Sequence, residues 1–198
     1  MKNIICNNCV GARLYECTGE QFPNPFMWSA IKSEDFVRLI NHWDDIDLKK
    51  AEFFLEQWKP EKPYKNVGVA LPYGITVHFE HYLQDDTVES PTKKPGSDNE
   101  MYCNDAIQYA KEKWFSRLSR MKTPPVFLIV DNYYIMNFSD VKDIENFTHP
   151  VYFFTHTPSN AREQLRGKRV IVLNNPLEEA PTGTLARLLL KGHRDLFV

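Results

Sequence analysis

Asn7, Asn8 and Cys9 directly follow a short apolar run, Asn3–Cys6, at the point where the sequence predicts the start of a helix. A thiol in the first helical turn meets unpaired backbone N–H groups and the positive end of the helix dipole, and both favour the thiolate. The two amides can donate hydrogen bonds to a developing oxyanion. The pattern predicts a nucleophile at Cys9. One alternative stays open: the amides cap the turn and Cys9 only packs.

A second stretch with possible chemistry holds two histidines, His78 and His81, followed by Tyr82. Either imidazole could take the proton from the thiol. The histidines are three residues apart in a predicted strand, so they point to opposite faces and only one can serve the site. The strand end favours His81 as the base. His78 is then a core histidine or, with Tyr82, a substrate contact.

Cys6 and Cys9, and also His78 and His81, have the spacing of zinc ligands. However, Cys6 is predicted to lie inside a strand, the two histidines face apart, and a structural zinc site needs four converging ligands. We therefore expect no bound metal.

Three further charged residues are candidates for the site. Arg117 and Arg120 lie three apart on a predicted helix, so they share a face and could hold phosphate or carboxylate groups. Asp131 ends a predicted strand and could orient a catalytic histidine or bind a sugar hydroxyl. The alternatives are a solvated helix face for the two arginines and a simple cap for Asp131.

The composition excludes several classes of protein. A net charge of −2 leaves no electrostatic footprint for nucleic acid. We find no apolar run of about 20 residues that could span a bilayer, no signal peptide and no dinucleotide or P-loop motif. We expect a cytoplasmic protein, in which the four cysteines are reduced thiols.

The apolar patterns predict one domain over residues 1–198, with a loop insertion over 84–103. Short β-branched runs alternate with amphipathic helices, which is typical of parallel strands joined by crossovers. A hairpin around Pro72–Gly74 adds an antiparallel part. We expect an α/β fold, a three-layer α/β/α arrangement with a mixed, largely parallel sheet. The expected strands are 3–6, 67–71, 75–81, 126–130, 151–155 and 170–173; the expected helices are 10–17, 104–120, 161–166 and two that begin at Ser33 and Ser139.

Ligands of open α/β sheets bind beyond the carboxyl ends of the strands. Polar residues follow the predicted strands, so we expect them to form the site. They are Asn7 to Cys9, Glu80 to Tyr82, Asp131, Thr155-His156 and Asn174-Asn175.

Several short motifs occur together along the chain: Ile5–Gly11, Pro25-Phe26, Asp35-Phe36, His78–Tyr82 and Trp114–Arg120. As a set they resemble a bacterial family of unknown function, the domain of unknown function nineteen-nineteen, which is associated with exopolysaccharide biosynthesis. The chain departs from the family pattern at Cys6 and Val10, where the family usually has Ser and Trp, and in an apparent insertion over Thr87–Met101. The resemblance runs from Ile4 to about Asn175.

The resemblance implies a role in capsule or exopolysaccharide assembly. We expect a transferase that moves an acyl group to a sugar, with an acyl-CoA or nucleotide-sugar donor that is not tightly bound. Partners would be a donor, a sugar or glycan acceptor and, peripherally, membrane polysaccharide machinery. The alternatives are a glycosyl- or phosphoryl-transfer enzyme with the same pocket, or a non-catalytic binding protein.

Overall fold

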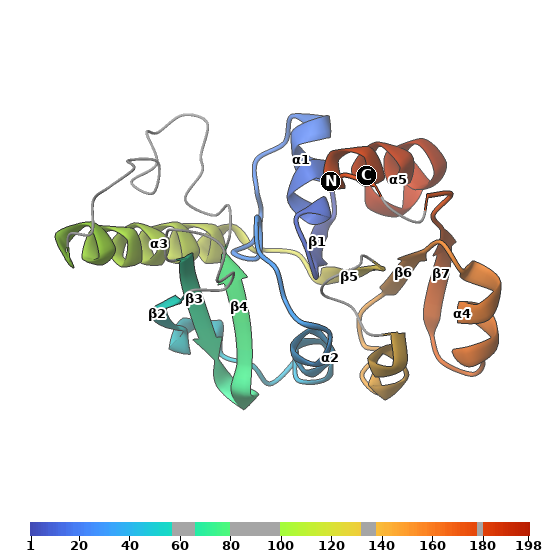
Figure 1. Ribbon diagram of the computed structural model, residues 1–198, viewed down its shortest axis with the longest axis horizontal. Helices are drawn as coiled ribbons and strands as arrows, with labels where there is room; N and C mark the ends of the chain where they lie inside the picture. The colour runs from blue at the N-terminus through green and yellow to red at the C-terminus, as the bar shows by residue number, and fades with distance from the viewer. Residues whose placement is uncertain (57–65, 80–99, 132–137, 178–179) are drawn as a thin grey trace.

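The computed structural model describes residues 1–56, 66–79, 100–131, 138–177 and 180–198. Their strands form two separate sheets (Figure 1). The larger sheet has four parallel strands in the order β1-β5-β6-β7. They are β1 (Asn3–Cys6), β5 (Pro125–Val130), β6 (Val151–Thr155) and β7 (Val170–Asn174).

The smaller sheet is antiparallel, in the order β2-β3-β4. Its strands are β2 (Glu52–Glu56), β3 (Asn66–Leu71) and β4 (Ile75–Phe79). The predicted α/β class is confirmed. The hairpin does not join the parallel sheet, however, because the free edge of β4 pairs with Ala30 instead of with a parallel strand.

Helices cover both faces of the parallel sheet (Figure 1). Alternate residues of a strand face opposite sides. Ile4 and Cys6 therefore pack with α1 (Val10–Thr18) and α5 (Thr182–Phe197). Ile5 packs on the other side, with the helices of the opposite layer. These are α2 (Ser33–Asn41), the 3₁₀ helix η4 (Phe138–Asp143) and α4 (Pro158–Gln164).

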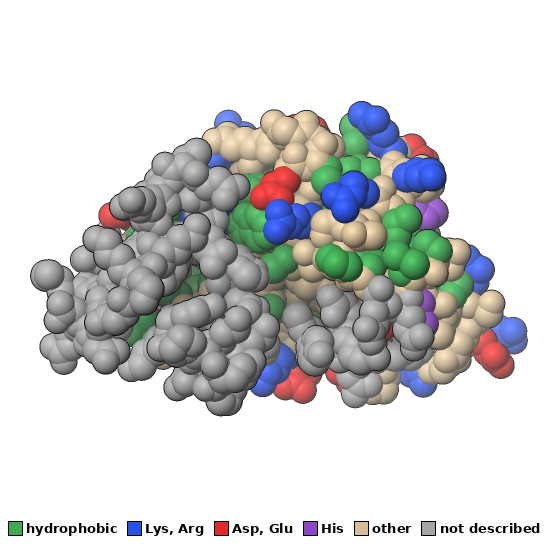
Figure 2. All heavy atoms as spheres, turned by 45° about the horizontal axis from the view of Figure 1, so that its top comes forward, with side chains coloured by type: hydrophobic (Ala, Val, Ile, Leu, Met, Phe, Trp, Pro, Cys, Tyr) green, Lys and Arg blue, Asp and Glu red, His purple; other side chains and the backbone are tan. Residues whose placement is uncertain are grey.

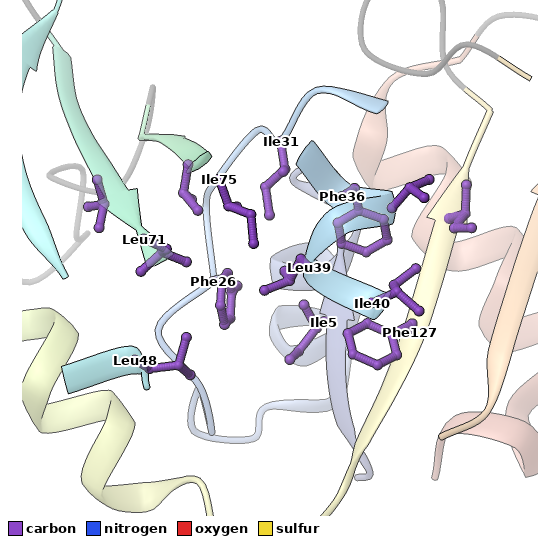
Figure 3. Close-up of a cluster of buried hydrophobic side chains, with 14 of the residues drawn as sticks. Ile5, Phe26, Ile31, Phe36, Leu39, Ile40, Leu48, Leu71, Ile75 and Phe127 are labelled. Atoms are coloured by element: carbon purple, nitrogen blue, oxygen red, sulfur yellow. The ribbon is translucent and has the colours of Figure 1, made fainter. Parts of the chain in front are cut away.

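The core on the α2 side joins the two sheets. Figure 3 shows Phe26, Leu39 and Phe127 gathered between the parallel sheet and the strands of the smaller one. The long helix α3 (Glu100–Arg120) packs against β2 and β3. Its Trp114 is fully buried, and the indole N–H donates to the Leu48 carbonyl at 3.1 Å. The smaller sheet is therefore anchored by aromatic packing.

Four sequence predictions need correction or completion. The helix α3 begins at Glu100, so Asn104 lies inside it; the rest of the expected insertion, 84–99, is outside the described residues. The helix expected after Ser139 is a single short 3₁₀ segment. The first helical residue of α2 is Ser33, and Lys32 occupies the cap position. The whole of α5 was not predicted.

Gly11 lets α1 lie directly against β1. A Cβ atom at this position would lie 2.7 Å from the Cβ of Cys6, closer than side chains pack. The start of α1, and Cys9 with it, is therefore fixed against the end of β1. The helix ends as its sequence predicts, with Gly19 in the left-handed conformation at a φ of 69°.

Candidate functional site

The connections that leave β1 and β5 go to opposite faces of the sheet. The chain after β1 enters α1 on one side, whereas the chain after β5 reaches η4 on the other. Ligands of open α/β sheets bind where neighbouring connections diverge in this way, at the carboxyl ends of the strands. The predicted residues Asn7, Asn8, Cys9 and Asp131 all lie at this edge.

Asn7 is used to close the sheet. Its side chain is fully buried, its Nδ2 donates to the Val130 carbonyl at 3.1 Å, and its Oδ1 accepts from the Val130 N–H at 2.8 Å. An amide that pairs with both backbone groups of one residue continues the pairing of β1 with β5 beyond Cys6. Both ends of the Asn7 amide are therefore used in holding the sheet together. Of the two predicted oxyanion donors, Asn8 is the better placed.

Asn8 folds over the first turn of α1. Its Oδ1 accepts from the backbone N–H of Val10 at 3.0 Å and from the Cys6 thiol at 3.4 Å. The other end of the same amide, Nδ2, is buried and has no hydrogen-bond partner among the residues that the structure describes. A buried donor without an acceptor is rare in folded proteins and needs an explanation. Asn8 is the amide with a free donor at this helix start.

Cys9 occupies the N-cap position of α1, as predicted, and is partly exposed. Its side chain does not cap the helix; the Sγ lies 3.9 Å from the Ser29 carbonyl oxygen. A thiol must lose its proton before its sulfur can act as a nucleophile. A reaction at Cys9 therefore needs a base that removes this proton.

The segment 27–31 joins both sheets beside Cys9. Ile31 donates its N–H to the Asn7 carbonyl at 2.9 Å, and Ala30 exchanges two backbone hydrogen bonds with His78. Trp28 has a left-handed backbone, with a φ of 64°, although it is not a glycine. Such backbone conformations are unfavourable and cluster at functional sites.

Arg117 reaches this same segment from α3. Its guanidinium is buried, donates to the Met27 carbonyl at 3.3 Å and lies 5.0 Å from the ring centre of Phe22. Arg120 is half-buried, and its Nε has no hydrogen-bond partner in the described part of the chain. The predicted pair therefore has one member engaged with the segment beside Cys9 and one with a donor to spare.

His78 points toward Glu56 across the smaller sheet. The imidazole Nδ1 lies 2.7 and 2.8 Å from the two carboxylate oxygens, and both side chains are largely buried. Gly68 on the intervening strand makes this possible, because a Cβ there would lie 3.0 Å from the Glu56 carboxyl carbon. His78 is thus a buried, hydrogen-bonded histidine, and its backbone pairs with Ala30 of the segment beside Cys9.

Asp131 forms a polar group with residues that follow β6. Its Oδ2 accepts from the Thr155 hydroxyl at 2.6 Å and lies 3.6 Å from the Nδ1 of His156. Thr155 is fully buried, and the side chain of His156 is 32% exposed. Asp131 therefore has a histidine neighbour, as predicted, but that histidine is His156, which was noted in the sequence only as a strand end. The feature of the sequence that could have indicated His156 is its position directly after a predicted strand.

His81 and Tyr82 lie outside the described residues. Within the described ranges, no three His, Cys, Asp or Glu side chains come together as a metal site would require. The expectation of no bound metal stays a prediction.

Cys6 is inert by comparison with Cys9. Burial raises the pKa of its thiol to about 12. In the unfolded chain the same thiol ionises near pH 9, so between these values the unfolded state loses a proton that the folded state keeps. Stability therefore falls as the pH rises through this range, by about 1.4 kcal/mol per pH unit.

We expect Cys6→Ala to flatten this alkaline loss of stability. Urea unfolding of the wild type and the variant at intervals from pH 8 to pH 10 measures the slope. The exposed Cys17 provides the control, because Cys17→Ala should retain the wild-type slope. Equal slopes in wild type and Cys6→Ala would contradict the assignment. Above pH 10 the buried Tyr15, whose pKa is also raised by burial, adds to the loss.

The fold and the edge residues define a parallel α/β protein with a polar group at the carboxyl ends of β1, β5 and β6. Comparison with known proteins finds a similar family. The sequence profile of a domain of unknown function (DUF1919) matches residues 2–94. The resemblance noted above is supported over these residues, and the match stops short of the Trp114–Arg120 motif.

A relative from Haemophilus influenzae, described as "Uncharacterized protein", is 26% identical over 159 residues. The match covers 78% of this chain and 62% of the relative, so the chain spans less than two thirds of that protein. Neither description names an activity or a polysaccharide. None of the helices in the described part of the chain is long and apolar enough to cross a lipid bilayer.

Proposed function

We propose that this chain is a transferase that moves an acyl group from a thioester donor to a sugar hydroxyl, with Cys9 as the nucleophile. The observation that carries the proposal is that two adjacent residues at the start of α1 supply a part-exposed thiol, on Cys9, and a buried Nδ2, on Asn8, that has no hydrogen-bond partner among the described residues. Such a donor suits the oxyanion that forms when a thiolate attacks a thioester carbonyl. A role of this chain in polysaccharide assembly is part of the same proposal.

In the first half of the reaction, the Cys9 sulfur attacks the donor carbonyl and the donor thiol leaves with the electron pair of its C–S bond. The proton of the Cys9 thiol passes to a base, for which His81 was the sequence candidate. The acyl group is then carried on Cys9. Asn8 would hold the carbonyl oxygen while it bears negative charge.

A second candidate is glycosyl or phosphoryl transfer from a nucleotide sugar, without a covalent intermediate. The spare Nε donor of Arg120, three residues from Arg117, favours it, since arginine pairs bind phosphate groups well.

We expect iodoacetamide near pH 7 to alkylate Cys9 before Cys17 and Cys103, because thiolate character and access together decide thiol reactivity. Peptide mass spectrometry after a short exposure measures the order. Faster labelling of Cys17 or Cys103 would contradict a nucleophile at Cys9.

The matched test of function is incubation with acetyl-CoA and, separately, with nucleotide sugars, followed by intact-mass analysis and a thermal-shift measurement. An acetyl group on wild type and on Cys17→Ser, but not on Cys9→Ser, would support acyl transfer. A thermal shift with a nucleotide sugar and no acyl adduct would favour the second candidate. The absence of both would oppose a transferase.

A further inference from the structure

We propose that the acceptor is an anionic sugar, which carries a phosphate or a carboxylate group, and that Arg13 binds this group. The inference rests on the proposed transfer and deepens it, because it names the class of sugar that the site takes. The observation behind it is the place of the Arg13 guanidinium, one helical turn after Cys9 and over the ring of Trp28.

Arg13 and Cys9 lie on one side of α1. The Arg13 N–H donates to the Cys9 carbonyl at 3.1 Å, a helical hydrogen bond, and residues spaced four apart have Cβ atoms about 5–6 Å apart. Both side chains also contact the same segment. The Cys9 Sγ lies 3.9 Å from the Ser29 carbonyl oxygen, and the Arg13 guanidinium carbon lies 4.6 Å from the ring centre of Trp28. A helical side chain covers the turn before its own Cα, so the guanidinium reaches back toward the thiol.

Two neighbours hold the Arg13 guanidinium in place. The Trp28 ring below it is buried and packs edge-on against Phe22, with ring centres 6.4 Å apart. Glu16 Oε2 accepts from Nη1 at 2.6 Å, which uses one of the five N–H donors of an arginine. Since 43% of the side chain is exposed, a ligand can reach other donors. A guanidinium held on an aromatic ring presents a planar fork that matches a phosphate or a carboxylate.

The surroundings of Cys9 favour a negative charge. The start of α1 carries the positive end of the helix dipole, and the buried Nδ2 of Asn8 adds an N–H group that has no acceptor among the described residues. Figure 2 shows Lys and Arg side chains at the surface on the side of the molecule where α1 and α5 lie. The two helices carry more basic than acidic residues, with Arg13, Arg187, Lys191 and Arg194 against Glu16 and Asp195.

The short span between Cys9 and Arg13 assigns the anionic group to the acceptor and not to the donor. In an acyl-CoA, the long pantetheine arm separates the phosphates from the thioester carbonyl, so a phosphate at Arg13 would lie too close to the reacting sulfur. In a sugar phosphate or a uronic acid, the hydroxyl groups lie within one sugar ring of the anionic group. Such an acceptor can place its anion on Arg13 and a hydroxyl beside the acyl group on Cys9.

The first test is calorimetric titration of the full chain with glucose 6-phosphate, glucuronic acid, glucose and inorganic phosphate. We expect at least one of the two anionic sugars to bind about tenfold or more tightly than glucose, as a charge-assisted pair of hydrogen bonds would give. Binding of neither anionic sugar, or equal binding of glucose, would overturn the inference. Inorganic phosphate that binds as tightly as glucose 6-phosphate would overturn the assignment to a sugar.

Variants of Arg13 decide whether this residue makes the contact. Arg13→Gln should remove the preference for the anionic sugar, and Arg13→Lys, which keeps the charge but not the fork, should lose less of it. Arg194→Gln is the control. This exposed arginine is in the last turn of α5, where the Phe197 carbonyl accepts from the Lys2 N–H, at the end of β1 opposite to Cys9. A preference that persists in Arg13→Gln, or that Arg194→Gln also removes, would overturn the role of Arg13.

The second test measures transfer with a donor that acylates Cys9. Arg13→Gln should raise KM for the anionic sugar about tenfold and leave kcat nearly unchanged, because the contact is the same in the ground state and the transition state. An unchanged KM would overturn the inference, whereas unchanged transfer in Cys9→Ser would overturn only the nucleophile. The calorimetric result needs no acyl group, so it decides the inference even when Cys9 forms no adduct.

Discussion

Trp114→Ala is expected to lower the free energy of unfolding by about 3–5 kcal/mol, as large-to-small changes of buried aromatics do. The Trp114 side chain is fully buried and meets Phe26, Phe53 and Phe79 at ring-centre distances of 5.4, 6.0 and 6.0 Å. The cavity would open where α3, the smaller sheet and the segment after α1 meet. Urea unfolding followed by circular dichroism measures the effect.

The neighbouring Phe115 is the matched control, since its side chain is 41% exposed on the same helix. Phe115→Ala should change the stability by less than about 1 kcal/mol. Trp114→Phe separates packing from the indole hydrogen bond to the Leu48 carbonyl, and should lose an intermediate amount. Equal losses at 114 and 115 would show that α3 is not anchored as described.

Asn7→Ala is expected to lower mainly the stability of the protein, and Asn8→Ala is expected to lower mainly the rate of transfer. Asn7→Ala removes both hydrogen bonds to Val130 inside the sheet, and the free energy of unfolding should fall by about 2–6 kcal/mol, at roughly 1–3 kcal/mol for each of the two buried groups left unpaired. Asn8→Ala loses one helix-start bond, worth about 1 kcal/mol. Its main effect should be on transfer, with kcat lowered by about 10²–10³, as for one oxyanion donor.

The measurements are urea unfolding of both variants and the acyl-Cys9 assay. Asn8→Asp is a further comparison, because it retains the Oδ1 acceptor for Val10 and replaces the donor. A large loss of stability in Asn8→Ala with normal transfer would reverse the two roles.

The sequence predicts most elements where the pattern is local. The strand 3–6, the helix that follows it and its end at Gly19 all depend on neighbours within a few residues, and the structure confirms them. The helix α5 was missed although Leu185 and Leu189 show helical spacing and are buried. Its apolar face packs against α1, which is far away in the sequence. The local pattern alone therefore does not show what this face would bury.

The sequence predicted which residue types form the candidate site and where they lie along the chain. It predicted much less well which residues contact one another. Cys9 was expected at the start of a helix and lies there. The division of tasks between Asn7 and Asn8 depends on Val130, which lies more than a hundred residues away. The pairing of Asp131 with His156 requires that β5 and β6 be neighbours, which no local pattern indicates.

The order β1-β5-β6-β7 also has a consequence for how the chain folds as it is synthesised. Asn3 pairs with Pro125, so β1 leaves the ribosome about 120 residues before its sheet partner. At roughly 5–20 residues per second, that delay lasts on the order of ten seconds. The pairing then closes a long loop, a slow step in folding. Until then, the apolar run and the thiols of Cys6 and Cys9 stay accessible to chaperones, to other nascent chains and to oxidants.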